Sequence, residues 1–89
     1  MAVLMIGEVP GMTPEMYDGM AVNLMPRLRE AKGFISHAAG MLGGEWRVTE
    51  LWESEEDSAR WFEANVKPSL PAGVVPNRTF HELHNLVRA

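Results

Sequence analysis

The stretch ELWESEE, residues 50–56, decides the fold, because it holds a strand end, a tryptophan and a helix start in immediate succession. Ser54, with Asp57 three residues later, resembles a capping box that has Asp in place of the usual Glu. The acidic run that begins at Glu55 lies in the first turn of the helix, where the helix dipole favours negative charge. The stretch therefore predicts a strand through Glu53 followed directly by a helix.

A hairpin is predicted immediately upstream. Residues 34–42 and 45–53 have the composition of strands, and Gly43-Gly44 between them is a favoured two-residue hairpin turn. Strand residues placed symmetrically about such a turn lie opposite one another and share a face of the sheet. The predicted pairs on one face are Met41 with Trp46, Ala39 with Val48, His37 with Glu50, and Ile35 with Trp52.

Two further strands and a long helix are predicted in the rest of the chain. Residues 3–9 form a compact apolar run typical of a buried strand, and residues 78–87 are predicted to form the final strand. A helix of about five turns is predicted from the Thr13 cap to Gly33, which would end it in a left-handed conformation. Pro26 inside this helix removes a backbone donor and predicts a kink or a break.

The helix that follows the third strand is predicted to bury a stripe made of Ala59, Phe62 and Val66, with Trp61 on its flank. The resulting order is β-α-β-β-α-β in a single domain that spans residues 1–89. This order predicts an α+β, ferredoxin-like fold with a four-stranded antiparallel sheet and two helices on one face.

The other face of that sheet would have no helix over it. Strand residues such as Phe34, Ala38 and Leu42 make this face too apolar to be left to water. A second copy related by a two-fold axis would cover it. We therefore expect a homodimer that forms a dimeric α/β barrel.

Composition excludes several classes of function. The net charge of −4, with no basic cluster longer than Arg27-x-Arg29, argues against nucleic acid or an anionic membrane as partner. The absence of cysteine excludes disulfides, thiol catalysis and thiolate metal sites. No segment approaches the roughly 20 apolar residues of a membrane span, and the apolar run at residues 2–6 is too short for a signal peptide. We expect a cytoplasmic protein.

His37 and Glu50 are the candidate catalytic residues. A carboxylate beside an imidazole in an apolar, tryptophan-lined setting can orient the ring and form a general acid/base pair. Cross-strand His–Glu pairs also occur as ordinary sheet contacts without chemistry. Both interpretations are open from the residues alone.

The string His81-Glu82-Leu83-His84 is the other candidate for chemistry. Histidines three residues apart share a face on a helix but point to opposite sides of a strand, and the spacing is not that of the H-E-x-x-H zinc motif. No metal site is predicted. His84, with Phe80 and Leu86 on its face, is expected to reach either the pocket or the dimer interface.

Aromatic and methionine side chains are predicted to line a cavity. Tyr17 either offers a phenol to this cavity or only packs against it. The methionines of the first helix, among them Met20, form either an adaptable lining or a loosely specified core. The side chains predicted to bind substrate are Tyr17, Met20, Leu24, Trp46, Trp52, Phe62 and His84.

The order of elements, the Gly-Phe-x-x-His stretch at 33–37 and the Leu-Trp-Glu-Ser-Glu-Glu stretch at 51–56 resemble the antibiotic biosynthesis monooxygenase-like family. This family is a branch of the dimeric α/β-barrel superfamily, and the resemblance covers nearly the whole chain. It implies a homodimer whose sheets pack back to back, with a pocket between each sheet and its own helices. Members include cofactor-free oxygenases of aromatic polyketides, haem-degrading enzymes and polyketide cyclases.

The chain departs from two branches of that family. In the haem-degrading branch the tryptophan that matches Trp52 lines the pocket, and a histidine on the second helix ligates the iron. Position 62 here is Phe, and no histidine lies between residues 38 and 80, so haem degradation is not expected. The aromatic-oxidising branch relies on Asn, Trp and Tyr, and this chain has Trp52 and Tyr17 but no evident matching Asn.

Two functional hypotheses follow. The first is an enzyme resembling cofactor-independent monooxygenases of aromatic or polyketide substrates. In it His37 removes a proton from an electron-rich phenol, and the substrate itself reduces oxygen without cofactor or metal. The same base could instead form an enolate for a polyketide cyclisation or isomerisation without oxygen. The second hypothesis is a non-catalytic dimeric module that binds a small apolar or aromatic molecule.

Overall fold

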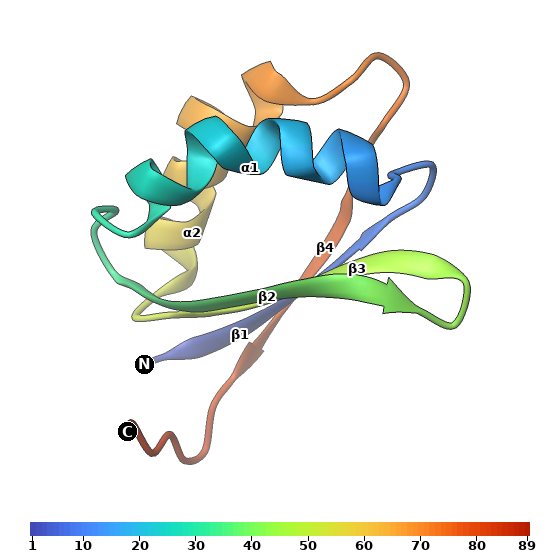
Figure 1. Ribbon diagram of the computed structural model, residues 1–89. Coiled ribbons are helices and arrows are strands. Elements are labelled where there is room, and N and C mark those ends of the chain that lie inside the picture. Colours follow the sequence, from blue (N-terminus) through green and yellow to red (C-terminus); the bar gives the residue numbers. More distant parts are fainter.

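Four antiparallel strands form one sheet, and both helices cover the same face of it (Figure 1). The structure is a computed structural model that describes residues 1–89. The strands are β1 (Val3–Val9), β2 (Phe34–Leu42), β3 (Glu45–Trp52) and β4 (Asn77–Glu82), in the spatial order β2-β3-β1-β4. The helices are α1 (Pro14–Leu28) and α2 (Glu55–Trp61), and α2 continues into the π-helical turn η1 (Phe62–Val66) and the 3₁₀ turn η2 (Lys67–Ser69). The α+β, ferredoxin-like prediction is confirmed.

Both helices begin at the capping residues that the sequence predicts. The Thr13 hydroxyl accepts a hydrogen bond from the backbone N–H of Met16 at 3.1 Å. The Ser54 hydroxyl accepts one from the backbone N–H of Asp57, also at 3.1 Å. Each cap satisfies a backbone donor that would otherwise be unpaired, which stabilises a helix by about 1 kcal/mol.

Helix α1 is shorter than predicted and is not broken at Pro26. It runs through Pro26 and ends at Leu28, because the proline lies in the last turn, where only one backbone donor is lost. The chain then reaches Gly33, which adopts the predicted left-handed conformation with φ of 82°. That glycine redirects the chain into β2 several residues after the helix has ended.

The β2–β3 hairpin has the predicted turn. Gly43 and Gly44 have φ angles of 61° and 79°, and positive values at both positions are what a type I′ turn requires. The register pairs His37 with Glu50, as predicted, and the pairs between this one and the turn also agree.

The predicted pairing of Ile35 with Trp52 is wrong. A β-bulge between Phe34 and Ser36 inserts Ile35 as an extra residue, so that Phe34 is the residue opposite Trp52. The Phe34 ring meets the Trp52 ring edge to face, with centroids 5.5 Å apart. This contact places Phe34 on the helix-covered face, whereas the sequence predicted it on the bare one.

The buried face of α2 also differs from the prediction. Ser58 and Trp61 are the buried residues of this helix, whereas Ala59 is exposed and Trp61 was predicted only on the flank. The helix widens into the π-helical turn η1 directly after Trp61. A π-helical turn contains more residues than an α-helical turn. The buried face that α-helical periodicity predicts through Val66 therefore does not continue unchanged past Trp61.

Strand β4 ends at Glu82 rather than at Val87. Met5 and Ile6 of β1 pair with Phe80 and Thr79, and the pairing stops at Val3 with Glu82, where β1 itself begins. The predicted alternation of faces therefore does not extend to His84, which lies beyond the strand and is exposed.

Two apolar clusters fill the space between sheet and helices. One contains Val3, Leu24, Leu28, Trp52 and Trp61. The other contains Val9, Met12, Trp46 and Val74. They lie toward opposite ends of β1, and the candidate site lies along the same helix-covered face. No helix of the structure has the length and hydrophobicity needed to cross a membrane.

The opposite face of the sheet carries no helix, as Figure 1 shows. Alternate residues of the central strands point to this side, among them Leu4 and Ile6 of β1 and Leu51 of β3. Ala38 and Leu42 lie on the same side of β2, as predicted. The structure therefore presents a sheet face that is partly apolar and has no covering helix.

Candidate active site

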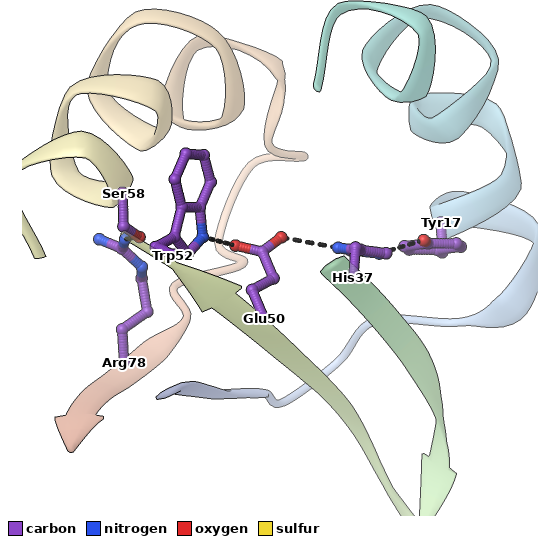
Figure 2. A network of polar contacts seen from close by, with 6 residues as sticks. All are labelled: Tyr17, His37, Glu50, Trp52, Ser58 and Arg78. Atoms are coloured by element: carbon purple, nitrogen blue, oxygen red, sulfur yellow. Dashed lines mark hydrogen bonds and ion pairs between the residues drawn. The ribbon is translucent and has the colours of Figure 1, made fainter. Parts of the chain in front are cut away.

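A chain of four polar side chains runs along the helix-covered face of the sheet (Figure 2). The Tyr17 hydroxyl lies 2.6 Å from Nε2 of His37, and Nδ1 of the same ring lies 2.6 Å from Oε2 of Glu50. The indole N–H of Trp52 donates to the other carboxylate oxygen, Oε1, at 2.9 Å. Both nitrogens of His37 and both oxygens of Glu50 are thus hydrogen-bonded.

Three elements position these side chains. The hairpin register places His37 of β2 opposite Glu50 of β3, and Trp52 shares their face because it lies two residues along the same strand. Tyr17 comes from the first turn of α1, where its backbone N–H bonds to the carbonyl of Thr13 at 3.0 Å. The capped start of α1 thus fixes the position along β2 at which the Tyr17 phenol contacts this strand.

Aromatic contacts hold the Tyr17 ring in place. It lies nearly parallel to the His37 ring, with an interplanar angle of 10° and centroids 6.1 Å apart. It also packs against Trp46, with centroids 5.0 Å apart. These contacts leave the phenol little freedom to turn away from the imidazole.

The directions of the hydrogen bonds follow from the carboxylate. An ionised carboxylate can only accept, so Nδ1 of His37 carries the proton that is donated to Glu50. In the neutral ring Nε2 is then an acceptor, and the Tyr17 hydroxyl donates to it. The chain therefore has one direction, from the phenol through the imidazole to the carboxylate.

Burial and charge shape the acidity of the phenol. Burial raises the pKa of the Tyr17 hydroxyl above its ordinary value, and the negative charges of Glu50 and Asp18 raise it further. The phenol therefore stays protonated at neutral pH and keeps a proton to donate. Glu50, only 7% exposed, is held in this setting by its two donors, which offset part of the cost of burying its charge.

A largely apolar pocket lies beside this chain, between the sheet and its own helices. Its polar and charged lining side chains are Tyr17, His37, Glu50 and Arg78, and the other lining side chains are apolar or aromatic. The floor includes Gly7 of β1, which has Val48 opposite on one side and Arg78 on the other. Gly7 has no side chain of its own, and the Met5 thioether lies beside the position that a Cβ would take there.

The structure brings together most of the residues predicted to form the site. His37, Glu50 and five of the predicted substrate-binding residues line the pocket, namely Tyr17, Met20, Leu24, Trp46 and Phe62. Trp52 is fully buried and touches the site only through Glu50, and His84 lies outside the pocket on the exposed segment after β4. Met16 packs against the cluster around Trp46, and Met25 lines the pocket.

Arg78 is the charged pocket residue that was not predicted from the sequence. It was predicted only as the first residue of the last strand, so its face was undefined. Its pairing with Gly7 of β1 places it on the helix-covered side. The spacing of Arg78 and Phe80 on either side of the polar Thr79 was the signal in the sequence that could have suggested this position.

The donor set at the pocket does not fit a haem. Phe62 stands where a second-helix ligand would be expected, and its ring lies against the Arg78 guanidinium rather than offering a ligand. Both nitrogens of His37 are engaged by Tyr17 and Glu50. No three His, Cys, Asp or Glu side chains come close enough together to hold a metal ion.

Comparison with known proteins gives matches at the level of structure. No protein-family model and no curated protein matches the sequence. SnoaB, a cofactor-independent oxygenase from Streptomyces nogalater, superposes with a TM-score of 0.72 at 10% identity, over 99% of this chain and 98% of that chain. The monooxygenase from the gene ActVA-Orf6 of Streptomyces coelicolor, solved with the ligand nanaomycin D, has a TM-score of 0.67 at 19% identity, over 99% and 92% of the two chains.

A third match has a different ligand. A mutant of MhuD, solved with two manganese protoporphyrin IX molecules per active site, superposes with a TM-score of 0.70 at 15% identity, over 98% of this chain and 99% of that chain. The chain thus has the fold of the antibiotic biosynthesis monooxygenase-like proteins, as the sequence resemblance implied. Because proteins of this fold bind such different ligands, activity has to be argued from the site.

The raised pKa of Tyr17 predicts how the protein titrates in alkali. Tyr17 is the single tyrosine of the chain, so the near-ultraviolet absorbance of tyrosinate reports on it alone. The midpoint should lie above about 10 in the native protein and return to about 10 in denaturant. Between these two values the unfolded chain has lost a proton that the native one keeps, so stability should fall as pH rises above about 10.

Two variants identify the source of this shift. Glu50→Gln should lower the native midpoint, because the charge of Glu50 is one of the causes that raise it. Glu8→Gln removes a carboxylate paired with Arg47 outside the pocket, and should leave the midpoint unchanged. A wild-type midpoint at or below that of the denatured protein would contradict the geometry described for Tyr17.

Proposed function

We propose that this chain is a cofactor-independent monooxygenase of small phenolic aromatic molecules. His37 is the general base, Glu50 orients it and stabilises its charged form, and Tyr17 connects it to the substrate. The observation that carries the proposal is the Tyr17–His37–Glu50 chain, which has contacts of 2.6 Å at both links and lies at the wall of an apolar pocket.

The phenol of Tyr17 stands between His37 and the substrate in this proposal. Nε2 of His37 is already hydrogen-bonded to the Tyr17 hydroxyl, so a substrate in the pocket meets the tyrosine first. The substrate hydroxyl donates its proton to Oη of Tyr17 while Tyr17 passes its own proton to Nε2. The imidazolium that results lies against the Glu50 carboxylate, which stabilises its charge.

The oxidation that follows needs no external reductant. The substrate phenolate supplies electrons to molecular oxygen, and one oxygen atom forms a bond to a carbon of the aromatic ring. That carbon loses its hydrogen as the bond between the two oxygen atoms breaks, so that the ring becomes a quinone and the second oxygen atom leaves as water. The apolar walls exclude bulk water, which protects the reactive intermediate, and the Glu50 carboxylate offsets the cost of forming the imidazolium in this setting.

Oxygen uptake with 1,5-dihydroxynaphthalene tests the role of His37. The wild-type protein should consume oxygen and form the hydroxynaphthoquinone, both followed directly with an electrode and by visible absorbance. His37→Ala should lower kcat/KM by about 100-fold or more, the range expected for loss of a general base. Tyr17→Phe should also lower it, because the proton path is interrupted.

Arg60→Ala is the control, since Arg60 lies on α2 with an exposed side chain and outside the pocket. It should leave turnover unchanged. Full turnover by His37→Ala would contradict the catalytic assignment. Conversion of a polyketide-like ketone without oxygen uptake would instead support a cyclisation with the same base, and ligand binding without either reaction would indicate a binding module.

We also propose that two copies pair through the bare face of the sheet. Ile6 and Leu4 of β1 and Leu51 of β3 lie on this side, with no helix over them. A chain of this size buries a smaller fraction of its surface than a larger domain does, so covering this face would add considerably to its stability.

Substitution of Ile6 tests this pairing. Ile6→Lys places a charge in the middle of the proposed interface and should convert a species of twice the 9.9 kDa chain mass into a monomer, as measured by light scattering after gel filtration. Val22→Lys is the matched control, because Val22 lies on α1 with 74% of its surface exposed. A monomeric wild-type protein at micromolar concentration, or an Ile6→Lys protein that remains a dimer, would contradict the proposal.

A further inference from the structure

Arg78 occupies the edge of the pocket farthest from the proton chain. The strand order β2-β3-β1-β4 places His37 in one edge strand and Arg78 in the other. Figure 2 shows the same separation, with Arg78 and Ser58 on one side of Trp52 and with His37 and Tyr17 on the other. Both Arg78 and Tyr17 line the pocket, so a single ligand can meet both.

The guanidinium of Arg78 has no carboxylate partner. Its Nη2 donates to the hydroxyl of Ser58, a fully buried side chain, at 3.0 Å, and its Nε is buried without any partner. None of the ion pairs of the chain includes Arg78, whereas Arg47, Arg60 and Arg88 each pair with a carboxylate. Most of the five N–H donors of this guanidinium therefore have no protein acceptor.

Aromatic rings hold the guanidinium in position. Its central carbon lies 4.0 Å from the centroid of the Phe62 ring and 5.1 Å from that of Phe80. Burial lowers the pKa of Arg78, and the charges of Glu50, Glu63 and Glu55 partly oppose this shift. The Arg78 side chain is half-buried, and a cation partly removed from water without a close carboxylate is costly.

We propose that Arg78 binds a carboxylate of the substrate, so that the natural ligands are aromatic acids with a phenolic hydroxyl at the opposite end. This deepens the proposed function, because it uses the same pocket. The planar fork of an arginine matches a carboxylate with two parallel hydrogen bonds, and a low-polarity setting strengthens them. The aromatic body of the ligand then lies along the apolar wall, and its hydroxyl meets Tyr17.

Binding of a matched pair of probes tests this inference. The probes are 6-hydroxy-2-naphthoate and its neutral carboxamide, which share the ring and the hydroxyl and differ at the acidic group. Isothermal titration calorimetry at neutral pH should show that the wild-type protein binds the acid at least tenfold more tightly than the amide. This ratio corresponds to about 1.4 kcal/mol, at the low end for a charge-assisted hydrogen bond.

Substitutions of Arg78 should remove this preference. Arg78→Gln should weaken binding of the acid by about 10- to 100-fold and change binding of the amide by less than about threefold. Arg78→Lys keeps the positive charge but loses the paired donors of the planar guanidinium. It should therefore retain part of the preference for the acid over the amide. Arg60→Gln removes a positive charge that lies outside the pocket and should leave both affinities unchanged.

Several outcomes would overturn the inference. The first is failure of the wild-type protein to bind the acid, and the second is equal wild-type affinity for the acid and the amide. The third is an equal loss of affinity for both probes in Arg78→Gln. The wild-type preference and the Arg78→Lys variant keep the test decisive if Arg78→Gln does not fold. Arg78-dependent binding of the acid without oxygen uptake would leave this inference standing and count against oxygenation. Oxygen uptake by the wild-type protein, together with equal affinity for the acid and the amide, would instead count against this inference and leave the proposed oxygenation standing.

Discussion

The carboxylate of Glu50 is the group on which the rest of the site depends. It lies almost fully buried in the middle of β3, and it receives one hydrogen bond from Trp52 and one from His37. Without those donors a carboxylate in this position would carry a large desolvation cost. The hairpin register, the orientation of the imidazole and the burial of Trp52 are therefore tied together. A slip of one residue would turn His37 toward the bare face.

The pocket joins two chemically different ends across this sheet. At the β2 edge the Tyr17–His37–Glu50 chain can accept a proton, and at the β4 edge Arg78 offers unpaired donors and a positive charge. Gly7, which has no side chain, lies in the sheet between them. The arrangement suits a flat ligand with an ionisable hydroxyl at one end and an anion at the other. The fold positions these groups, but their identity rather than the fold determines the chemistry.

The hairpin was predictable because its information is local. The Gly43-Gly44 turn fixes the pairing, so His37 opposite Glu50 followed from the residues alone. The bulge at Ile35 did not follow, because the contact of Phe34 with Trp52 that accompanies it is a tertiary contact that the local sequence does not specify. The role of Arg78 was equally hidden, since its face depends on where β4 pairs with β1. The contact of Tyr17 with His37 depends on how α1 packs over the sheet, which local sequence does not specify.

The protonation state of the His37 ring is the most direct test of the central claim, that one directed chain links Tyr17, His37 and Glu50. Nitrogen chemical shifts of the assigned imidazole, recorded by NMR where the ring is neutral, distinguish its two tautomers. The structure predicts the proton on Nδ1, with Nε2 a hydrogen-bonded acceptor whose shift changes in Tyr17→Phe. A proton on Nε2, or shifts that average as in a free imidazole, would contradict the account.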